Sequence, residues 1–447
     1  MKKSALEIER SSVRGATLLL IQDHSLPVVR FMVTLKPGAL ADPWQQAGMT
    51  RAVLDLTLRG TRSRSRQAFN AALEEMGTSL SAATRMEFAM WRGMTLKRHL
   101  TPTFALLAEA MAAPALSDEE LGPLIDEVIE GLRASHDDDE TLAEVFLRRT
   151  LFRGHLLGRS SQGEVGDLQG LTVDSIRAAH RARVVPGAMI VVMAGDLNLA
   201  EATSALEALI GSLPDTPAPT LTPPPIRHPD KLSILIVDKP ERTQAQLRLA
   251  CVGVDGNHPD VLGLWLGILA FGGTFTSPLT HEVRDVRGWS YGAHAAFDRL
   301  GGLPAAVILR SAPAVEDAVS CLALELELYQ GLAKGELAAE TLDFARSYSL
   351  NRYPLEIASS ADLATAALRH EIIGQRPSAA FDLTERLASL NLAEVGPTLA
   401  RHLHPEHVCA VVVASAGSVE ASLRARFPSA DLAIVDFREG LGFKLTT

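Results

Sequence analysis

Two kinds of hydrophobic pattern alternate along this chain. Short apolar runs, such as those at 188–194 and 408–414, have the length of a buried β-strand. Between them lie longer stretches in which apolar residues return every three or four positions, as on one face of a helix. No stretch resembles a transmembrane helix by this reading. Strands are few and helices are long, so the pattern predicts an α+β or α/β layered protein.

Several helices are marked by their ends. Residues 49–58 contain neither proline nor glycine and place four apolar residues on one face, namely Met49, Ala52, Val53 and Leu56. Residues 67–76 form a second predicted helix, which Gly77 ends. Residues 117–135 begin with a serine N-cap followed by acidic residues. The pair Gly122–Pro123 predicts a kink or a break in this third helix.

A proline-rich segment divides the chain. Residues 214–229 contain seven prolines among sixteen residues, which disfavours a helix and favours a stiff, extended connector. The sequence therefore predicts an N-terminal domain at 1–213, a linker at 214–229 and a C-terminal domain at 230–447.

The two halves share a pattern. Residues 180–197 and 400–418 both run from a basic helix end through a proline into a β-branched strand and a turn of small residues. Residues 32–43 and 249–260 both read as a strand, a glycine turn and a proline ahead of a helix. Because the two matches lie at nearly one offset, they indicate an internal duplication. Chance recurrence of strand-and-turn patterns is the alternative.

Composition, charge and cysteine count narrow the class of protein. Hydrophobic residues make up 47% and charged residues 21%, as is usual for globular proteins. The net charge of −10 argues against nucleic acid as a partner. The three cysteines, Cys251, Cys321 and Cys409, form neither a disulfide framework nor a metal knuckle. No signal peptide is visible at the start, which predicts a cytoplasmic protein or an exported one whose leader has been removed.

One segment of the first half contains short motifs in a distinctive order. Residues 48–61 read GMTRAVLDLTLRGT, preceded by GALADP at 38–43 and followed by LEEMGTSLSA at 73–82. This order resembles the N-terminal domain of the pitrilysin-type (inverzincin) zinc peptidases, in their processing-peptidase-like bacterial branch. The resemblance implies an α+β fold of two homologous α/β-layer domains, each a mostly antiparallel sheet covered by helices.

The resemblance also identifies which positions would hold zinc. In the family, this helix carries H-x-x-E-H, in which two histidines bind zinc and the glutamate is the general base. Here those positions hold Arg51, Leu54 and Asp55, and the later ligand position holds Ala134. A zinc site needs three protein ligands, whereas only the aspartate among these residues can ligate. We therefore expect no metal in this chain, and Glu127, a further matching acid, is read as a solvated helix residue.

A second histidine motif is rejected as a peptidase site. Residues 403–407 read LHPEH, so leucine stands at the first ligand position of H-x-x-E-H. Pro405 would also break the helix that brings the histidines to one face. We predict a polar turn ahead of a strand, which includes His402, His404 and His407.

The second half retains a different signature. Residues 270–294 read AFGGTFTSPLTHEVRDVRGWSYGAH. They resemble the family segment in which a glycine turn and a short helix ending in arginine precede a tyrosine at a strand entry. The resemblance assigns Arg284 and Tyr291 to the arginine–tyrosine pair that contacts the substrate and the developing oxyanion. Both side chains are hydrogen-bond donors, which suits that role.

Three hypotheses for function follow. In the first, the chain is the non-metal-binding subunit of a heteromeric zinc metallopeptidase, inactive alone. It would supply Arg284, Tyr291 and half of a clamshell peptide chamber to a homologous H-x-x-E-H partner that holds the zinc. The second is a non-catalytic structural or peptide-binding protein of the same fold. The third, an independent enzyme, has neither a G-x-S-x-G elbow nor a P-loop to support it. The resemblance favours a periplasmic setting if a leader was removed, with a cytoplasmic one as the alternative.

Overall fold

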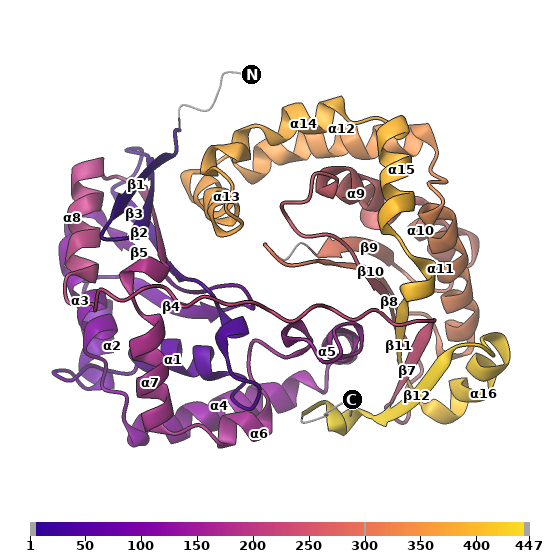
Figure 1. Cartoon of the computed structure of the whole chain (residues 1–447), viewed down its shortest axis with the longest axis horizontal. Helices are drawn as coiled ribbons and strands as arrows, with labels where there is room; N and C mark the ends of the chain where they lie inside the picture. Colours follow the sequence, from indigo (N-terminus) through magenta and orange to yellow (C-terminus); the bar gives the residue numbers. More distant parts are fainter. Residues whose placement is uncertain (1–5, 299–300, 442–447) are drawn as a thin grey trace. The chain divides into compact units, whose positions relative to one another are not determined.

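The computed structural model describes residues 6–298 and 301–441 (Figure 1). The chain forms two compact units, each assembled from three segments. Unit 1 consists of Met1–Gly131, Ser160–Pro223 and Pro354–Asp382. Unit 2 consists of Leu132–Arg159, Pro224–Tyr353 and Leu383–Thr447. Each unit therefore includes one segment that comes from the other half of the sequence.

The sheet of unit 1 has six strands in the order β1-β2-β6-β3-β5-β4. Only the β2–β6 pair is parallel, and the other neighbours run antiparallel. The strands are β1 (Glu9–Val13), β2 (Ala16–Gln22), β3 (Val28–Leu35), β4 (Ser79–Thr84), β5 (Ala89–Leu96) and β6 (Met189–Gly195).

The sheet of unit 2 has six strands in the order β12-β7-β11-β8-β10-β9. The β7 pairs with β11 and β12 are parallel, and the remaining pairs are antiparallel. The strands are β7 (Ser233–Asp238), β8 (Gln246–Val252), β9 (Ala293–Asp298), β10 (Ala306–Ser311), β11 (Cys409–Ala414) and β12 (Asp431–Asp436). Five strands of each sheet follow the same order along the chain, which confirms two homologous layered domains.

The repeated sequence pattern corresponds to the central parallel strand of each sheet. Strands β6 and β11 are buried along their whole length. A short 3-10 turn with proline at its start precedes each of them, at Pro186–Ala188 and at Pro405–His407. A proline suits the first position of such a turn because its missing N–H would have no partner there.

Helices cover both sheets. Their bounds are α1 (Met49–Thr57), α2 (Arg66–Glu75), α3 (Leu100–Ala112), α4 (Asp118–Ser135), α5 (Asp139–Leu151), α6 (Val165–Gln169), α7 (Val173–Arg183), α8 (Leu199–Ile210), α9 (Val261–Ile268), α10 (Pro278–Thr280), α11 (Ala318–Ala333), α12 (Ala339–Glu356), α13 (Ser360–Ile372), α14 (Leu383–Ser389), α15 (Leu392–His402) and α16 (Ala416–Arg426). Together with the sheets they confirm the predicted fold class.

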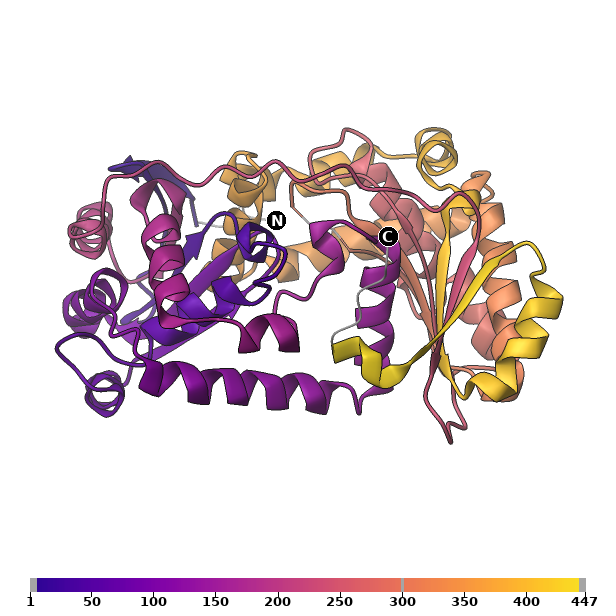
Figure 2. The ribbon, with the colours of Figure 1, turned by 60° about the horizontal axis from the view of Figure 1, so that its bottom comes forward.

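The third predicted helix is continuous. Helix α4 contains Pro123 without being split, and Figure 2 draws it as one long rod. Pro123 and Glu119, whose carbonyl loses its usual donor, both lie on the exposed side, so water can hydrate that carbonyl. Residues 214–229, the predicted linker, form neither helix nor strand and run as an extended trace (Figure 2).

The two exchanged segments cover the sheets by different means. In unit 1, α13 places Leu363, Ala367 and Leu368 against Leu19 and Val192 in a buried apolar cluster. In unit 2, α5 packs on β8 and β11. There the Glu144 carboxylate accepts hydrogen bonds from the Nε atoms of Arg248 at 2.9 Å and Arg310 at 2.6 Å. The pKa of Glu144 is lowered by these arginines against the opposing effect of burial.

One helical run is longer and more apolar than the sequence reading allowed. Residues Val261–Val286 pass as a membrane span by length and composition, with a mean hydropathy of 1.4. Most of this window, 61%, is buried inside the protein, as in the core helix of a globular domain. Its apolar residues, among them Leu264, Leu266 and Ile268, belong to the core of unit 2.

Candidate functional site

Helix α1 is held by a buried carboxylate at its start. Asp42 accepts hydrogen bonds from the N–H groups of Gly48 at 3.1 Å and Thr50 at 3.0 Å. Arg183 of α7 binds the same carboxylate at 2.6 Å. Gly48 has a φ of +96°, and a Cβ there would lie 2.6 Å from Leu168, so the turn into α1 requires glycine. The frame of the helix is thus built from side chains outside the degenerate metal positions.

The three degenerate positions on α1 have different surroundings. Leu54 is 1% exposed and packs in the interior of unit 1. Arg51 and Asp55 lie one turn apart and form an ion pair with Nε and Oδ2 at 3.2 Å. Burial raises the pKa of the Asp55 carboxyl, while Arg51 opposes the rise. At the far end of α1, the Thr57 hydroxyl accepts a hydrogen bond from Trp91 Nε1 at 2.9 Å.

A charged cavity of about 440 Å³ lies beside these positions. Its lining combines basic and acidic side chains with an apolar wall: Arg51, Asp55, Leu58, Arg59, Arg66, Asn70, Leu124, Glu127 and Val128. Arg59 is 8% exposed and forms ion pairs with Glu127 and with Glu120, the latter at 3.4 Å. Arg66 also pairs with Glu120, at 3.3 Å. We call this group the charged cavity.

The chemistry of these side chains does not fit a zinc ion. Of the four positions, only Asp55 offers a ligand atom, and its carboxylate is already paired with Arg51. Glu127, read from sequence as a solvated residue, is 57% exposed but also paired with the buried Arg59. A divalent cation in this cavity would face the guanidinium groups of Arg51, Arg59 and Arg66, which carry the same sign of charge.

The fourth degenerate position lies on α4. Ala134 is exposed and follows Glu127 by seven residues. Two helical turns separate them, about 10 Å along the axis and nearly on the same face. Alanine has no donor atom, so the structure provides nothing there for a metal.

The second signature forms a compact helical segment in unit 2. Helix α9 continues into a π-helical turn at Leu269–Gly273, and a non-helical turn follows at 274–277. The short α10 then leads directly into a second π-helical turn at His281–Val286. A Cβ on Gly272 would lie 2.5 Å from Ala295 of β9, so glycine is required where the segment packs against the sheet. The buried Thr280 hydroxyl donates to the Ala293 carbonyl at 2.6 Å and ties α10 to the start of β9.

Arg284 lies on the second π-helical turn. Its Nε and Nη2 donate to both carboxylate oxygens of Asp285 at 2.7 and 3.1 Å. This pairing raises the pKa of Arg284 and lowers that of Asp285. The guanidinium carbon lies 3.7 Å from the centre of the Phe275 ring, a cation–π contact. Within the described residues, the shielded Nη1 has no hydrogen-bond partner.

Tyr291 lies seven residues further on, at the entry to β9. Its side chain is 87% exposed. Its charge interaction with Arg284 contributes to the raised pKa of the arginine, after the effects of Asp285. The backbone around it is fixed, because the Ser290 hydroxyl donates to the Gly292 carbonyl at 2.8 Å and accepts from the Ala312 N–H at 3.1 Å. The structure thus brings the predicted pair to one surface segment.

The sequence analysis missed three residues that contribute to these sites. Asp285 and Phe275 orient the Arg284 guanidinium. Arg59 binds the acids of the charged cavity. Asp285 could have been noticed, because it directly follows Arg284. Nothing in the sequence indicates the aromatic contact, since it depends on the rotamers of two long side chains.

Comparisons with known proteins agree on one family. The family model described as Insulinase (Peptidase family M16) matches residues 17–164, and the model described as Peptidase M16 inactive domain matches residues 170–341. An uncharacterized zinc protease of Streptomyces coelicolor is 26% identical over 298 residues, which is 64% of this chain. The match also spans 64% of that relative's length, less than two thirds.

Two further similarities bear on the fold and on assembly. A probable mitochondrial-processing peptidase subunit beta of Schizosaccharomyces pombe is 24% identical over 234 residues, 51% of this chain and 50% of that protein. The crystal structure of a peptidase M16 inactive domain from Pseudomonas fluorescens superposes with a TM-score of 0.84 at 21% identity. It covers 91% of this chain and 98% of the other, and it shows the same fold.

Proposed function

Because the chain belongs to the M16 peptidase family, we propose that it is the non-metal-binding subunit of a heteromeric zinc metallopeptidase. A homologous partner with H-x-x-E-H would hold the zinc and the general base. This chain would supply Arg284, Tyr291 and half of a clamshell chamber for peptides. The similarity to a subunit of a mitochondrial-processing peptidase supports a paired assembly.

The observation that carries this proposal is the state of the donors on the second signature. Arg284 has an Nη1 without a partner among the described residues, and the Tyr291 phenol is exposed. Donors that are already oriented and not engaged elsewhere can stabilise a developing oxyanion at little reorganisation cost. The bidentate pairing with Asp285 keeps the guanidinium in one plane and leaves that Nη1 for substrate.

Phe275 has a positioning role in this proposal. Its ring is 60% exposed and covers one face of the Arg284 guanidinium. Nη1 is itself shielded from solvent, so neighbouring atoms would have to shift for a peptide carbonyl to reach it. The stacked ring would hold the plane of the guanidinium and keep water from that face.

In the chemical step, this chain would act only through hydrogen bonds. The bound zinc of the partner would polarise the peptide carbonyl and activate water. Arg284 would donate to the carbonyl oxygen as negative charge develops, and Tyr291 would add a second donor. Asp285 would keep its carboxylate on Arg284, since its lowered pKa leaves it ionised at neutral pH.

The test is peptide cleavage by reconstituted mixtures. The chain alone should be inactive, and cleavage should rise when it is mixed with an H-x-x-E-H homologue from the same organism. A partner with its motif glutamate replaced by glutamine serves as the control. Equal cleavage with and without this chain would contradict the proposal.

The second candidate is a non-catalytic structural or peptide-binding protein. The charged cavity favours it, because the charged groups at the former metal positions are paired with one another. It predicts that the complex binds peptide equally well with Arg284→Ala and Tyr291→Phe. It also predicts that neither substitution changes cleavage by the partner. For the compartment, we propose a periplasmic setting if a leader is removed, with a cytoplasmic one as the alternative, and cell fractionation distinguishes the two.

A further inference from the structure

A group of four side chains in unit 2 lies outside both signatures. It consists of His228 at the end of the linker and of His404, Glu406 and His407 around the turn before β11; we call it the histidine cluster. A 3-10 turn has three residues per turn, so residues three apart lie on the same side. The turn Pro405–His407 therefore directs His404 and His407 to one side, although the same proline excludes the α-helical H-x-x-E-H geometry.

The backbone beneath the histidine cluster is fixed. Leu403 is 2% exposed and Val408 is fully buried, so apolar anchors flank the turn on both sides. The turn packs against β8 and α11 of the same unit. The side chains of His404 and Glu406 remain accessible, at 45% and 58% exposed. A rigid backbone with accessible side chains is suited to binding a ligand without refolding.

The side chains converge closely. The rings of His404 and His407 have centroids 5.5 Å apart, and His228 stacks on His407 at 5.2 Å. His404 Nδ1 lies 3.5 Å from Glu406 Oε1. One ligand atom each from His404, Glu406 and His407 lie within 4.8 Å of one another. Three imidazoles and one carboxylate make up a donor set that zinc commonly takes.

Two of these imidazoles have no competing partner. Within residues 6–298 and 301–441, neither ring nitrogen of His228 or His407 forms a hydrogen bond, so their lone pairs are not already engaged. Neutral imidazole is the form that binds metal ions.

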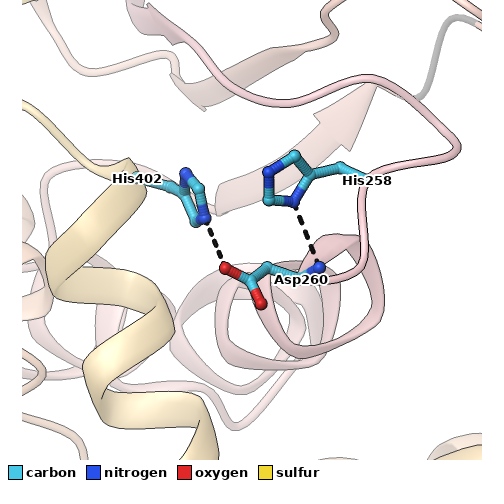
Figure 3. Close-up of side chains that lie close together, drawn as sticks. All are labelled: His258, Asp260 and His402. Atoms are coloured by element: carbon cyan, nitrogen blue, oxygen red, sulfur yellow. Dashed lines mark hydrogen bonds and ion pairs between the residues drawn. The ribbon is translucent and has the colours of Figure 1, made fainter.

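The neighbouring trio of His258, Asp260 and His402 differs, because its side chains already form hydrogen bonds (Figure 3). His402 Nε2 lies 2.7 Å from Asp260 Oδ2, and Arg401 binds the same oxygen at 2.5 Å. The backbone N–H of Asp260 donates to His258 Nδ1 at 3.1 Å. In this trio, Asp260 and His402 tie the start of α9 to α15, and His258 holds its own loop. A metal that used Asp260 Oδ2 would have to displace the Arg401 guanidinium.

We propose that the histidine cluster binds one divalent transition-metal ion of the Zn²⁺ class, with His404, Glu406 and His407 as ligands and His228 completing the set. At zinc–nitrogen distances of 2.0–2.1 Å, tetrahedral ligand atoms lie about 3.3 Å apart. Rotation of the accessible His404 and Glu406 side chains closes the remaining gap. The ion would fasten the end of the linker to unit 2. This site lies apart from the degenerate catalytic positions, so the proposed function, in which this chain lacks the catalytic zinc, does not depend on it.

The test is zinc titration of tag-free, metal-stripped full-length chain by calorimetry, with Co²⁺ spectroscopy to report tetrahedral ligation. We expect one saturable site. His404→Ala with His407→Ala should weaken binding by about 100-fold or more, since even residues that only support a ligand matter by 10- to 100-fold. His228→Asn should weaken it less. Zinc should also raise the Tm of the unaltered chain but not of the double variant.

The matched control replaces the neighbouring trio, with His258→Ala and His402→Ala, and should retain the site. The proposal is wrong if the unaltered chain shows no saturable zinc site. It is also wrong if the double variant binds zinc as tightly as the unaltered chain. Loss of binding in the control variant alone would also overturn it, because the metal would then lie at the trio. Should the double variant misfold, His407→Gln, which keeps a polar side chain of similar size, replaces it.

Discussion

The charged cavity of unit 1 and the Arg284–Tyr291 segment of unit 2 both contain arginines paired with carboxylates, but they differ in the donors that remain. In the cavity, Arg51 is paired with Asp55, and the buried Arg59 with two glutamates. On the Arg284–Tyr291 segment, the Nη1 atom of Arg284 has no hydrogen-bond partner in the described part of the chain, and the Tyr291 side chain is exposed. Paired charges stabilise a local structure, whereas oriented and unengaged donors are available to a ligand.

The difference extends to what each region contributes to folding. In unit 1, Leu54, which the resemblance aligns with the family's general base, is buried in the core and contributes packing. The Asp42 anchor and the Thr57–Trp91 hydrogen bond keep α1 in place without any metal. In unit 2, the exposed Tyr291 contributes little buried surface. Substitutions in the two regions should therefore affect different observables.

The largest effect should follow Arg284→Ala in the mixed complex. Removing a preorganised donor to an oxyanion costs about 100- to 1,000-fold in kcat. We expect that loss in peptide cleavage with only a small change in Tm, because the ion-pair partner of Arg284, Asp285, is 43% exposed and can be hydrated in its absence. Arg287→Ala, which removes a nearby exposed arginine, is the matched control. If the complex with Arg284→Ala cleaves peptide at the original rate, the Arg284–Tyr291 segment contributes no more to catalysis than the charged cavity does, which would contradict the account.

The next effect concerns stability. Leu54→Ala should lower the free energy of unfolding by about 2–5 kcal/mol, as is usual when a buried leucine is truncated. Leu26→Ala in the same unit should have little effect, since Leu26 is 66% exposed. Urea denaturation measures both. Complexes made from folded Leu54→Ala chain should cleave peptide normally, and a loss of turnover without a loss of stability would count against a packing role.

Tyr291→Phe should have a smaller effect on cleavage. A neutral phenol donor contributes about 0.5–1.5 kcal/mol, or roughly 2- to 13-fold in rate. The loss should appear in kcat rather than in KM, because the donor acts on the developing charge. Tyr348→Phe provides a control at another partly exposed tyrosine. An effect confined to KM would indicate a peptide-binding role instead.

The smallest effect should appear in the pH dependence of stability. Burial raises the pKa of Asp55 above its ordinary value of 3.8, so the folded chain binds that proton more tightly than the unfolded chain does. Its contribution to stability is therefore present at low pH and is lost as pH rises through the raised pKa.

Urea denaturation of the original chain and of Asp55→Asn checks this sign. The difference in unfolding free energy, original minus variant, should fall as pH increases from below 3.8 to neutral. The change should be small, because the side chain is partly exposed and paired with Arg51. A difference that grows with pH would show that the ion pair outweighs burial.

Much of the fold followed from the sequence, because it rests on local signals. The proline count predicted the linker, and the repeated strand-and-turn pattern predicted the two homologous sheets. The partners of α5 and α13 did not follow. An amphipathic helix shows which face it buries but not which sheet it covers, and these helices pack on the sheet of the opposite half of the chain.

The sequence shows the residue types of the candidate site but not their contacts. The residue types at positions 51, 54, 55 and 134 sufficed to argue against zinc ligation. The charge pairing of Arg59 and the stacking of Phe275 on Arg284 depend on side-chain rotamers, which leave no periodic trace in sequence. The turn at 405–407 was predicted as polar, but its gathering of three histidines was not.

The most direct test of the central claim is peptide cleavage by this chain alone, by an H-x-x-E-H homologue alone, and by both together, all with zinc supplied. The account predicts no cleavage by this chain, weak or no cleavage by the homologue, and strong cleavage by the mixture that depends on Arg284. Cleavage by this chain alone, or a mixture no more active than the homologue, would contradict it.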